Sequence, residues 1–311
     1  MKRGKAVLLG RPRMTGRERN ALFYGLLFAS PAILGFLIFV LGPMVASLVL
    51  SFTNYSIFAK AKFIGLWNYQ RLFSGTDPFF YKSLGVTFYY VVLSVPVYVI
   101  FAFILASLLT GKMRGKAVFR TLLYLPSIVP SVASMMIWMW LLNPDLGLVN
   151  TALGSLHLPK SLWLYSETTV VPSVVLTGIW GVGSSMVIFL AGLESIPNQF
   201  YESIEMDGGN AFHKLVGVTV PMMTPTIFFN TVLGIIGAFQ IFTQAYILTN
   251  GGPNNASLFF VFFLWREAFR NTQMGYACAI AWVLFIIIML FTALVFRSSR
   301  FWVYYEGGET A

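Results

Sequence analysis

The chain has 311 residues, of which 57% are hydrophobic and only 10% are charged, and its formal net charge is +10 at pH 7. A soluble domain usually carries about 25% charged residues, so this composition excludes an ordinary soluble domain and indicates an integral membrane protein. The excess positive charge lies largely in the N-terminal arm and the first inner loop, where membrane topology places it, and we therefore expect no binding to nucleic acid.

Six segments without Asp, Glu, Lys or Arg are long enough to hold membrane-spanning helices. A span needs about 20 mostly apolar residues, and its backbone must satisfy its own hydrogen bonds as a helix or a closed barrel. The segments are too long for barrel strands and lack strict alternation. We predict an all-α integral membrane fold with one transmembrane domain over residues 1–311. The six predicted spans lie near 22–50, 84–110, 121–142, 169–192, 223–248 and 273–296.

Basic residues predict the orientation of these spans. If the N-terminus is cytoplasmic, the inner segments hold 14 Lys and Arg residues and the outer segments hold 7. An excess of basic residues marks the cytoplasmic side. We therefore predict that both termini are cytoplasmic and that residues 1–21 form a basic cytoplasmic arm.

The third and fifth predicted spans each carry a stripe of polar and small residues at helical spacing. Ser127, Ser131 and Ser134 form the stripe of the third span. In a membrane such stripes favour close packing of helices and hydrogen bonds between them, but the same groups would suit a path for a solute. Both interpretations stay open at this stage. The fifth-span stripe consists of Asn230, Gly234, Gly237, Gln240 and Gln244.

We take Ser131, Asn230, Gln240, Gln244 and Tyr246 as candidates for contacts along a substrate path, with Trp180 as a second ring that could stack on a substrate. No acidic or basic residue lies in a predicted span. Intramembrane charges are the usual mark of proton- or ion-coupled transport. Their absence argues against a proton-driven carrier and favours a neutral substrate that is driven from elsewhere.

Two further segments have compositions that suggest local roles. The glycines of residues 178–185 allow tight backbone approach, and we interpret this part of the fourth span as a possible subunit interface. Residues 258–270 begin apolar and end charged, so we expect a helix at the membrane surface with Trp265 and Arg266 near the headgroups.

The sequence lacks the residues for several kinds of chemistry. Cys278 is the only cysteine, and the two histidines, His157 and His213, fall on opposite sides of the membrane in this topology. A thiolate cluster, a disulfide within the chain and a two-histidine metal site are therefore excluded. No phosphate-binding P-loop motif is present. We expect no catalytic residue, no metal and no cofactor in this chain.

The polar segment 194–221 holds Glu194 and three more acidic residues against a single basic one, Lys214. Pro197 suits the first turn of a helix, which we expect to run to Asp207. Gly208 and Gly209 then supply a stop that tolerates a left-handed residue. The three other acidic residues are Glu202, Glu205 and Asp207.

Beyond this stop, Asn210 is suited to cap a second short helix over residues 211–217. Thr224 and Pro225 are then expected to start the fifth span. Glu202 and Glu205 would share one face of the first helix. The segment is either a solvated helical hairpin or a docking element for a cytoplasmic partner.

The spacing of residues 202–221 resembles the E-A-A, three residues, G, nine residues, I-x-L-P motif of permease subunits in binding-protein-dependent ABC importers. Glu202 opens the motif, Gly208 follows after the correct gap, and Pro221 closes it after Val218 and Val220. Ser203 and Ile204 replace the two alanines, and valines replace Ile and Leu. The resemblance implies an ABC-importer permease fold in which residues 194–221 are the cytoplasmic coupling loop. The coupling residues it implies are Glu202, Glu205, Asp207, Gly208 and Pro221.

Two other stretches resemble carbohydrate-uptake permeases of the maltose and glycerol-phosphate type, namely "FIGLWNYQRLF" at 63–73 and "LTNGGPNNAS" at 248–257. The resemblance implies a multi-pass protein of a bacterial or archaeal cytoplasmic membrane that moves a sugar or oligosaccharide. Its implied partners are a second permease subunit, two ATP-binding subunits that hold ATP and Mg, and an extracytoplasmic solute-binding protein. The alternatives are an importer for another solute, such as phosphate or a polyamine, and a channel or scaffold without an ATPase.

Overall fold

The computed structural model describes residues 15–111 and 114–304, so most of the predicted basic arm, up to residue 14, lies outside the described residues. Within these ranges the chain is helical, and pairing between extended segments is limited to two isolated bridges. The α-helices are α1 (Gly16–Phe36), α2 (Gly42–Ser51), α3 (Trp67–Phe73), α4 (Pro78–Thr110), α5 (Lys116–Tyr124), α6 (Ser131–Leu141), α7 (Leu148–Ser155), α8 (Val170–Ile179), α9 (Gly183–Glu194), α10 (Asn198–Met206), α11 (Ala211–Lys214), α12 (Val220–Phe239), α13 (Phe260–Trp265) and α14 (Met274–Ser299). The shorter π and 3-10 turns are η1 (Leu37–Leu41), η2 (Leu125–Ile128), η3 (Trp163–Tyr165), η4 (Leu215–Thr219), η5 (Ala245–Thr249) and η6 (Arg266–Arg270).

Four continuous helical stretches are long and apolar enough to cross a membrane, and two bent helix pairs raise this number to six if each pair is one span. The bent pairs coincide with the predicted third and fourth spans. The pair made by α5 with η2 and by α6 bends by 96°, and the pair α8 and α9 bends by 52°. The continuous stretches are Arg19–Ser51, Pro78–Thr110, Ala211–Phe239 and Met274–Ser299.

The prediction that Thr224 and Pro225 start the fifth span is wrong, because Pro225 lies inside α12. A proline within a helix has no N–H to donate to the carbonyl four residues earlier. For Pro225 this carbonyl is that of Pro221. The Thr224 hydroxyl donates to that carbonyl at 2.7 Å. Neighbouring hydroxyls commonly re-satisfy backbone in this way in membrane helices. The helix can therefore run without a stop from Ala211, through η4, to Phe239.

The third, fourth and fifth predicted spans are interrupted in the structure, and the predicted end of the fifth is wrong. The third span breaks at Val129, whose extended backbone is the conformation expected before a proline. The fourth breaks between Ile179 and Gly183, where glycines weaken the helix. The fifth ends at Phe239 instead of near residue 248, and Gln240–Phe242 separate α12 from the next helical turn.

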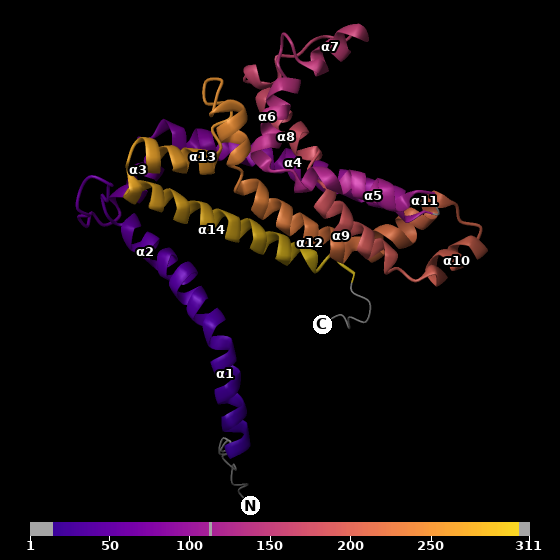
Figure 1. Cartoon of the computed structure of the whole chain (residues 1–311), viewed down its shortest axis with the longest axis horizontal. Helices are drawn as coiled ribbons and strands as arrows, with labels where there is room; N and C mark the ends of the chain where they lie inside the picture. Colours follow the sequence, from indigo (N-terminus) through magenta and orange to yellow (C-terminus); the bar gives the residue numbers. More distant parts are fainter. Residues whose placement is uncertain (1–14, 112–113, 305–311) are drawn as a thin grey trace, which may run out of the picture.

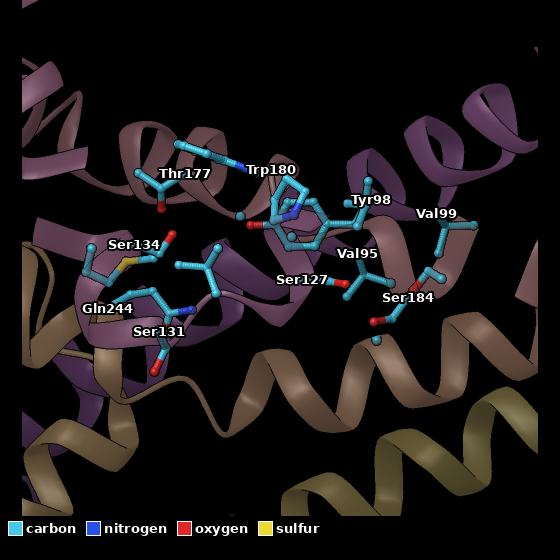
Figure 2. A pocket seen from close by; sticks show the side chains of 18 of the residues that line it. Val95, Tyr98, Val99, Ser127, Ser131, Ser134, Thr177, Trp180, Ser184 and Gln244 are labelled. Carbon is cyan, nitrogen blue, oxygen red and sulfur yellow. The ribbon is translucent and has the colours of Figure 1, made fainter. Parts of the chain in front are cut away.

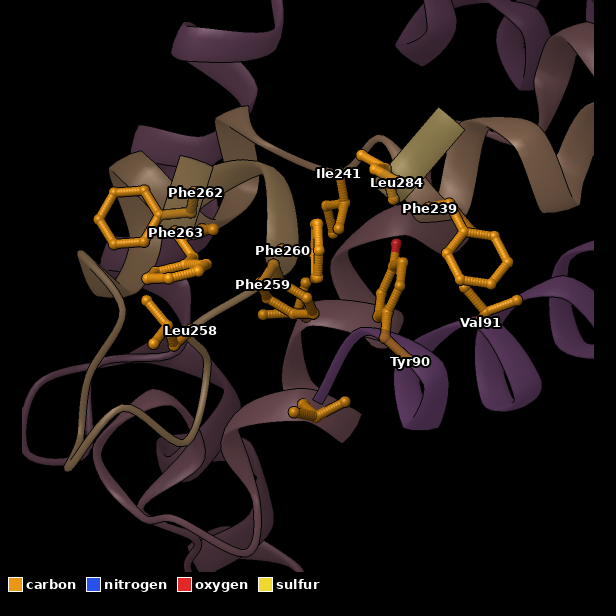
Figure 3. Close-up of a cluster of buried hydrophobic side chains, with 14 of the residues drawn as sticks. Tyr90, Val91, Phe239, Ile241, Leu258, Phe259, Phe260, Phe262, Phe263 and Leu284 are labelled. Atoms are coloured by element: carbon orange, nitrogen blue, oxygen red, sulfur yellow. The ribbon is translucent and has the colours of Figure 1, made fainter. Parts of the chain in front are cut away.

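Helix α4 is the frame of the molecule, and it packs against α8, α9, α12 and α13. Its C-terminal half contributes Ala102 and Ala106 to a buried cluster with Met186 and Phe189 of α9. Its N-terminal half joins a second cluster that is rich in phenylalanine (Figure 3). Helix α4 is thus continuous, whereas the third, fourth and fifth predicted spans are interrupted.

Residues 258–265 belong to that second cluster or pack against it, so the helix found over 260–270 buries apolar side chains against the rest of the chain, which the expectation of a helix at the membrane surface did not include. Phe260 and Phe263 are fully buried. Arg266 lies over the ring of Phe79, with 4.4 Å between the guanidinium carbon and the ring centroid. Glu267 is buried as well and accepts hydrogen bonds from the Asn271 side chain on both carboxylate oxygens. The segment packs against α4 and α14 because its apolar positions cover more than one face.

The first spanning stretch stands apart from the rest of the fold. Helix α2 packs against α14. Helix α1, which precedes α2 in the chain, extends away from the other helices (Figure 1). None of the residues in the most apolar 18-residue window of Arg19–Ser51 is buried within the chain. This stretch is stable only where lipid or another subunit covers its apolar side chains.

Candidate functional site

The two polar stripes predicted from the sequence come together at one cavity of about 380 Å³. Figure 2 shows Ser131 and Ser134 of α6 on the same side of this cavity as Gln244. Asn230 and Gly234 reach it from α12. The cavity is therefore lined by residues of the second, third, fourth and fifth predicted spans.

A second cavity of about 360 Å³ adjoins the first and contains Gln240 together with Gln244. Tyr90, Tyr98 and Gly234 line both cavities as well. The residues that line the two cavities include serine, threonine, tyrosine, asparagine and glutamine, but no Asp, Glu, Lys, Arg or His. The pair thus forms an uncharged space that offers many hydrogen-bonding groups.

All three breaks in the predicted spans line these cavities. Val129 marks the break of the third span, Gly181 that of the fourth, and Gln240 that of the fifth. Irregular backbone at membrane depth persists only where protein buries it or where it lines a water-filled cavity. Discontinuous helices surround the binding sites of many transporters for this reason. The breaks therefore identify the cavities as the polar interior of the molecule.

Sequence reasoning missed several residues of this site. Tyr90 and Tyr98, eight residues apart on α4, face the cavities, and Thr177 and Ser184 flank the α8–α9 bend. The spacing of the tyrosines matches one face of a helix, but aromatic residues are so frequent in this chain that the spacing carried no clear signal. Trp180 does line the first cavity, and its ring meets that of Trp138 edge to face.

Tyr246, in contrast, lies outside both cavities. Its ring centroid lies 4.9 Å from that of Trp265 and 5.5 Å from that of Phe242.

The glycines of residues 178–185 allow close packing within the chain itself. A Cβ at Gly183 would lie 2.7 Å from the carbonyl oxygen of Leu123. Their close approach is thus explained by packing between the third and fourth spans.

Within the segment 194–221, α10, residues 207–210 and α11 form a helical hairpin, which we call the coupling hairpin after the role that the sequence predicts for it. Helix α10 ends as predicted, and Gly208 adopts a left-handed conformation with φ of +77°. The Asn210 side chain accepts from the backbone N–H groups of Phe212 and His213. The imidazole of His213 accepts in turn from the N–H of Asn210, so α11 has a reciprocal cap.

Ile204 of α10 packs against the turn of the coupling hairpin and against η4. A Cβ at Gly209 would lie 2.3 Å from Cγ2 of Ile204, and one at Gly217 would lie 3.3 Å from its Cδ1. Isoleucine is larger than the alanine of the family motif, and the absence of side chains at Gly209 and Gly217 leaves room for it. Glu205 forms an ion pair with Lys214 across the hairpin.

Comparison with known proteins assigns the chain to a family. Residues 99–302 match the model of the "Binding-protein-dependent transport system inner membrane component". The chain belongs to this family. It is 43% identical over 289 residues to a "Probable ABC transporter permease protein YesP" of Bacillus subtilis, covering 92% of this chain and 93% of the relative. The family consists of membrane permease subunits and not of enzymes.

Two further comparisons extend this result. The permease is 31% identical to an "Arabinooligosaccharides transport system permease protein AraP" of Halalkalibacterium halodurans, covering 84% of this chain and 83% of the relative. Its fold matches a chain in the crystal structure of a bacterial alginate ABC transporter with a TM-score of 0.78, covering 91% and 95% of the two chains at 22% identity. The all-helical fold is therefore that of an ABC importer permease.

In this permease the coupling hairpin carries exposed apolar side chains next to its acids. Met206 and Phe212 are 86% and 68% exposed, and Glu202 and Asp207 are exposed beside them. Glu205 is held by Lys214, so Glu202 and Asp207 are the acids free of an ion pair among the described residues of the hairpin. Pro221 lies in the first turn of α12, where it joins the hairpin to the fifth span.

Proposed function

We propose that this permease conducts a neutral sugar or oligosaccharide through the two adjoining cavities. The observation that carries the proposal is the convergence of the three broken spans on an uncharged, hydroxyl- and amide-rich space. Hydroxyl and amide groups can donate and accept hydrogen bonds with a polyhydroxylated solute, whereas a charged solute would call for charged partners. Ser131, Asn230, Gln240 and Gln244 are the proposed contacts.

The names of its relatives support a sugar. One relative is named for the transport of arabinooligosaccharides, and the matching structure is of a transporter for alginate, an acidic polysaccharide. The absence of charged side chains around both cavities favours a neutral saccharide over an acidic one for this permease. Tyr246 lies outside these cavities, and we do not include it among the direct contacts.

We further propose that the coupling hairpin docks on an ATP-binding subunit. Its exposed Met206 and Phe212 would enter a groove on that subunit, and Glu202 would face basic side chains there. ATP and Mg would be held by two such subunits. A second permease subunit would complete the path, and a solute-binding protein would deliver the sugar from outside. In this assembly the chain spans the cytoplasmic membrane six times with both termini inside.

Purification and reconstitution of the whole assembly with its binding protein provide the test. Sugars from mono- to oligosaccharides, with phosphate and a polyamine as other solutes, would be assayed for stimulation of ATP hydrolysis and for uptake. We expect stimulation by at least one neutral saccharide and its loss by severalfold in Gln244→Leu. Tyr246→Phe, which changes a ring outside the cavities, is the matched control and should leave uptake unchanged. Stimulation by a non-saccharide alone would refute the proposed substrate.

A further inference from the structure

Tyr98 lies where the two cavities meet and next to the bend of the fourth span. Its ring projects from α4 and lines both cavities. Its hydroxyl donates to the carbonyl oxygen of Val175 in α8 at 3.0 Å. Val175 lies four residues before α8 ends at Ile179, and the 52° bend into α9 follows. The Tyr98 side chain thus connects α4 by a hydrogen bond to α8, the helix directly before the bend.

Gly178 provides the space for this contact. A Cβ at Gly178 would lie 2.0 Å from the hydroxyl oxygen of Tyr98 and 2.5 Å from its Cζ atom. Any other residue would push the ring away from α8. The hydrogen bond to Val175 therefore depends on a glycine within the last turn of α8.

The Tyr98 hydroxyl still has hydrogen-bonding capacity that faces the cavities. A hydroxyl has one proton to donate and two lone pairs that accept. Because that proton goes to Val175, the Tyr90 hydroxyl, 3.3 Å away, is the donor in the tyrosine pair. One lone pair of Tyr98 remains, and a solute acceptor can also compete for its proton. Figure 2 shows Tyr98 beside Trp180 and near Ser127, among the groups that a solute would meet.

The bend is directly linked to the coupling hairpin. Helix α9 ends at Glu194, and only Ser195–Pro197 separate it from α10. A change in the angle between α8 and α9 therefore displaces the start of α10. A ligand shifts a conformational equilibrium only if it interacts differently with the two states, and competition for the proton of Tyr98 is such a difference.

We propose that Tyr98 is a positioning residue that holds the α8–α9 bend while the cavities are empty and releases it when a solute hydroxyl competes for its hydrogen bond. The inference rests on the proposed function, since it takes the cavities as the solute path. The loss of the hydrogen bond between Tyr98 and Val175 would then be the change that α9 passes to the coupling hairpin. Tyr90 would support the ring but would not control the bend, because it has no bond to α8 among the described contacts.

The test compares Tyr98→Phe with Tyr89→Phe, which removes the hydroxyl of an exposed tyrosine on α4 that lines neither cavity. Spin labels at Thr168→Cys and Gln199→Cys, both exposed, report the distance across the bend in a Cys278→Ser background. In the reconstituted assembly without sugar, we expect Tyr98→Phe to shift this distance toward that of the sugar-loaded wild type. ATP hydrolysis without sugar should rise roughly two- to tenfold, as expected for the loss of one neutral hydrogen bond. Gly178→Ala should give the same result by displacing the ring, and Tyr89→Phe should behave like the wild type.

Wild-type distances and wild-type unstimulated ATP hydrolysis in Tyr98→Phe would overturn the inference. Equal effects of the two phenylalanine variants would also overturn it, because the contact with α8 would then have no special role. If the wild type itself shows no sugar-dependent change in distance or hydrolysis, the proposed function fails together with this inference. A normal wild-type response with an unaltered Tyr98→Phe variant defeats this inference alone.

Discussion

Substitution of Gly208 tests the coupling hairpin through its backbone alone. Gly208 has φ of +77°, and a Cβ at this position would meet no atom within 4 Å. A left-handed conformation costs a residue with a Cβ about 1–2 kcal/mol, and β-branched residues adopt it least readily. That free energy changes a population ratio by roughly 5- to 30-fold. We therefore expect Gly208→Val to lose most of the correctly angled hairpin while the spans insert normally.

The assay is uptake by proteoliposomes at matched permease levels, together with ATP hydrolysis in the presence and absence of loaded binding protein. Gly208→Val should abolish uptake and leave hydrolysis unresponsive to substrate. Gly208→Asn is the matched control, because asparagine tolerates the left-handed region and enters the same open space, so it should retain most activity. Wild-type uptake by the valine variant would refute the coupling role. Equal loss in both variants would show that added bulk, and not backbone conformation, causes the defect.

Three further predictions concern the path, the docking face and the topology. Gln240→Leu or Gln244→Leu should each reduce uptake by roughly 2- to 10-fold, the effect of one lost hydrogen bond, while the ATPase subunit still copurifies; equal loss of copurification would mean that these side chains serve packing. Glu202→Lys changes an exposed side chain and should leave folding within about 0.5 kcal/mol of the wild type. It should nevertheless release the ATPase subunit through charge repulsion, with Glu202→Gln intermediate, and full retention by the lysine variant would contradict docking through this acid. Cysteines at the exposed positions Arg114 and Gln199, in a Cys278→Ser background, should react with an impermeant thiol reagent only in inverted vesicles, and labelling in intact cells would overturn the topology.

The sequence was most informative where local chemistry decides the structure. Runs without charge located five of the six candidate spans closely, because every buried charge would be costly in a membrane, whereas the fifth, predicted over 223–248, lies in a helical stretch over 211–239. The turn of the coupling hairpin was also predictable, since a left-handed glycine and an asparagine cap act within a few residues. Gly208 and Asn210 have the roles that their residue types indicate.

The sequence was least informative where tertiary contacts compete with local preference. Pro225 is a common start signal for a helix, but the Thr224 hydroxyl satisfies the carbonyl that the proline leaves free. Residues 258–270 have the composition of a surface helix, yet Phe260 and Phe263 are enclosed by α4 and α14. Helix α12 ends at Phe239, and no proline in the sequence marks this end. The role of Tyr98 depends on Gly178, which lies 80 residues away in the sequence.

The lack of charge around the cavities has an electrical consequence. Moving one elementary charge across a membrane changes its energy by about 2.3 kcal/mol per 100 mV. The residues that line the two cavities include no Asp, Glu, Lys, Arg or His, so a rearrangement of these residues moves no formal charge across the membrane. A neutral solute adds none. Transport through these cavities should therefore proceed at the same rate in polarised and depolarised cells, and only the supply of ATP and of loaded binding protein would set its pace.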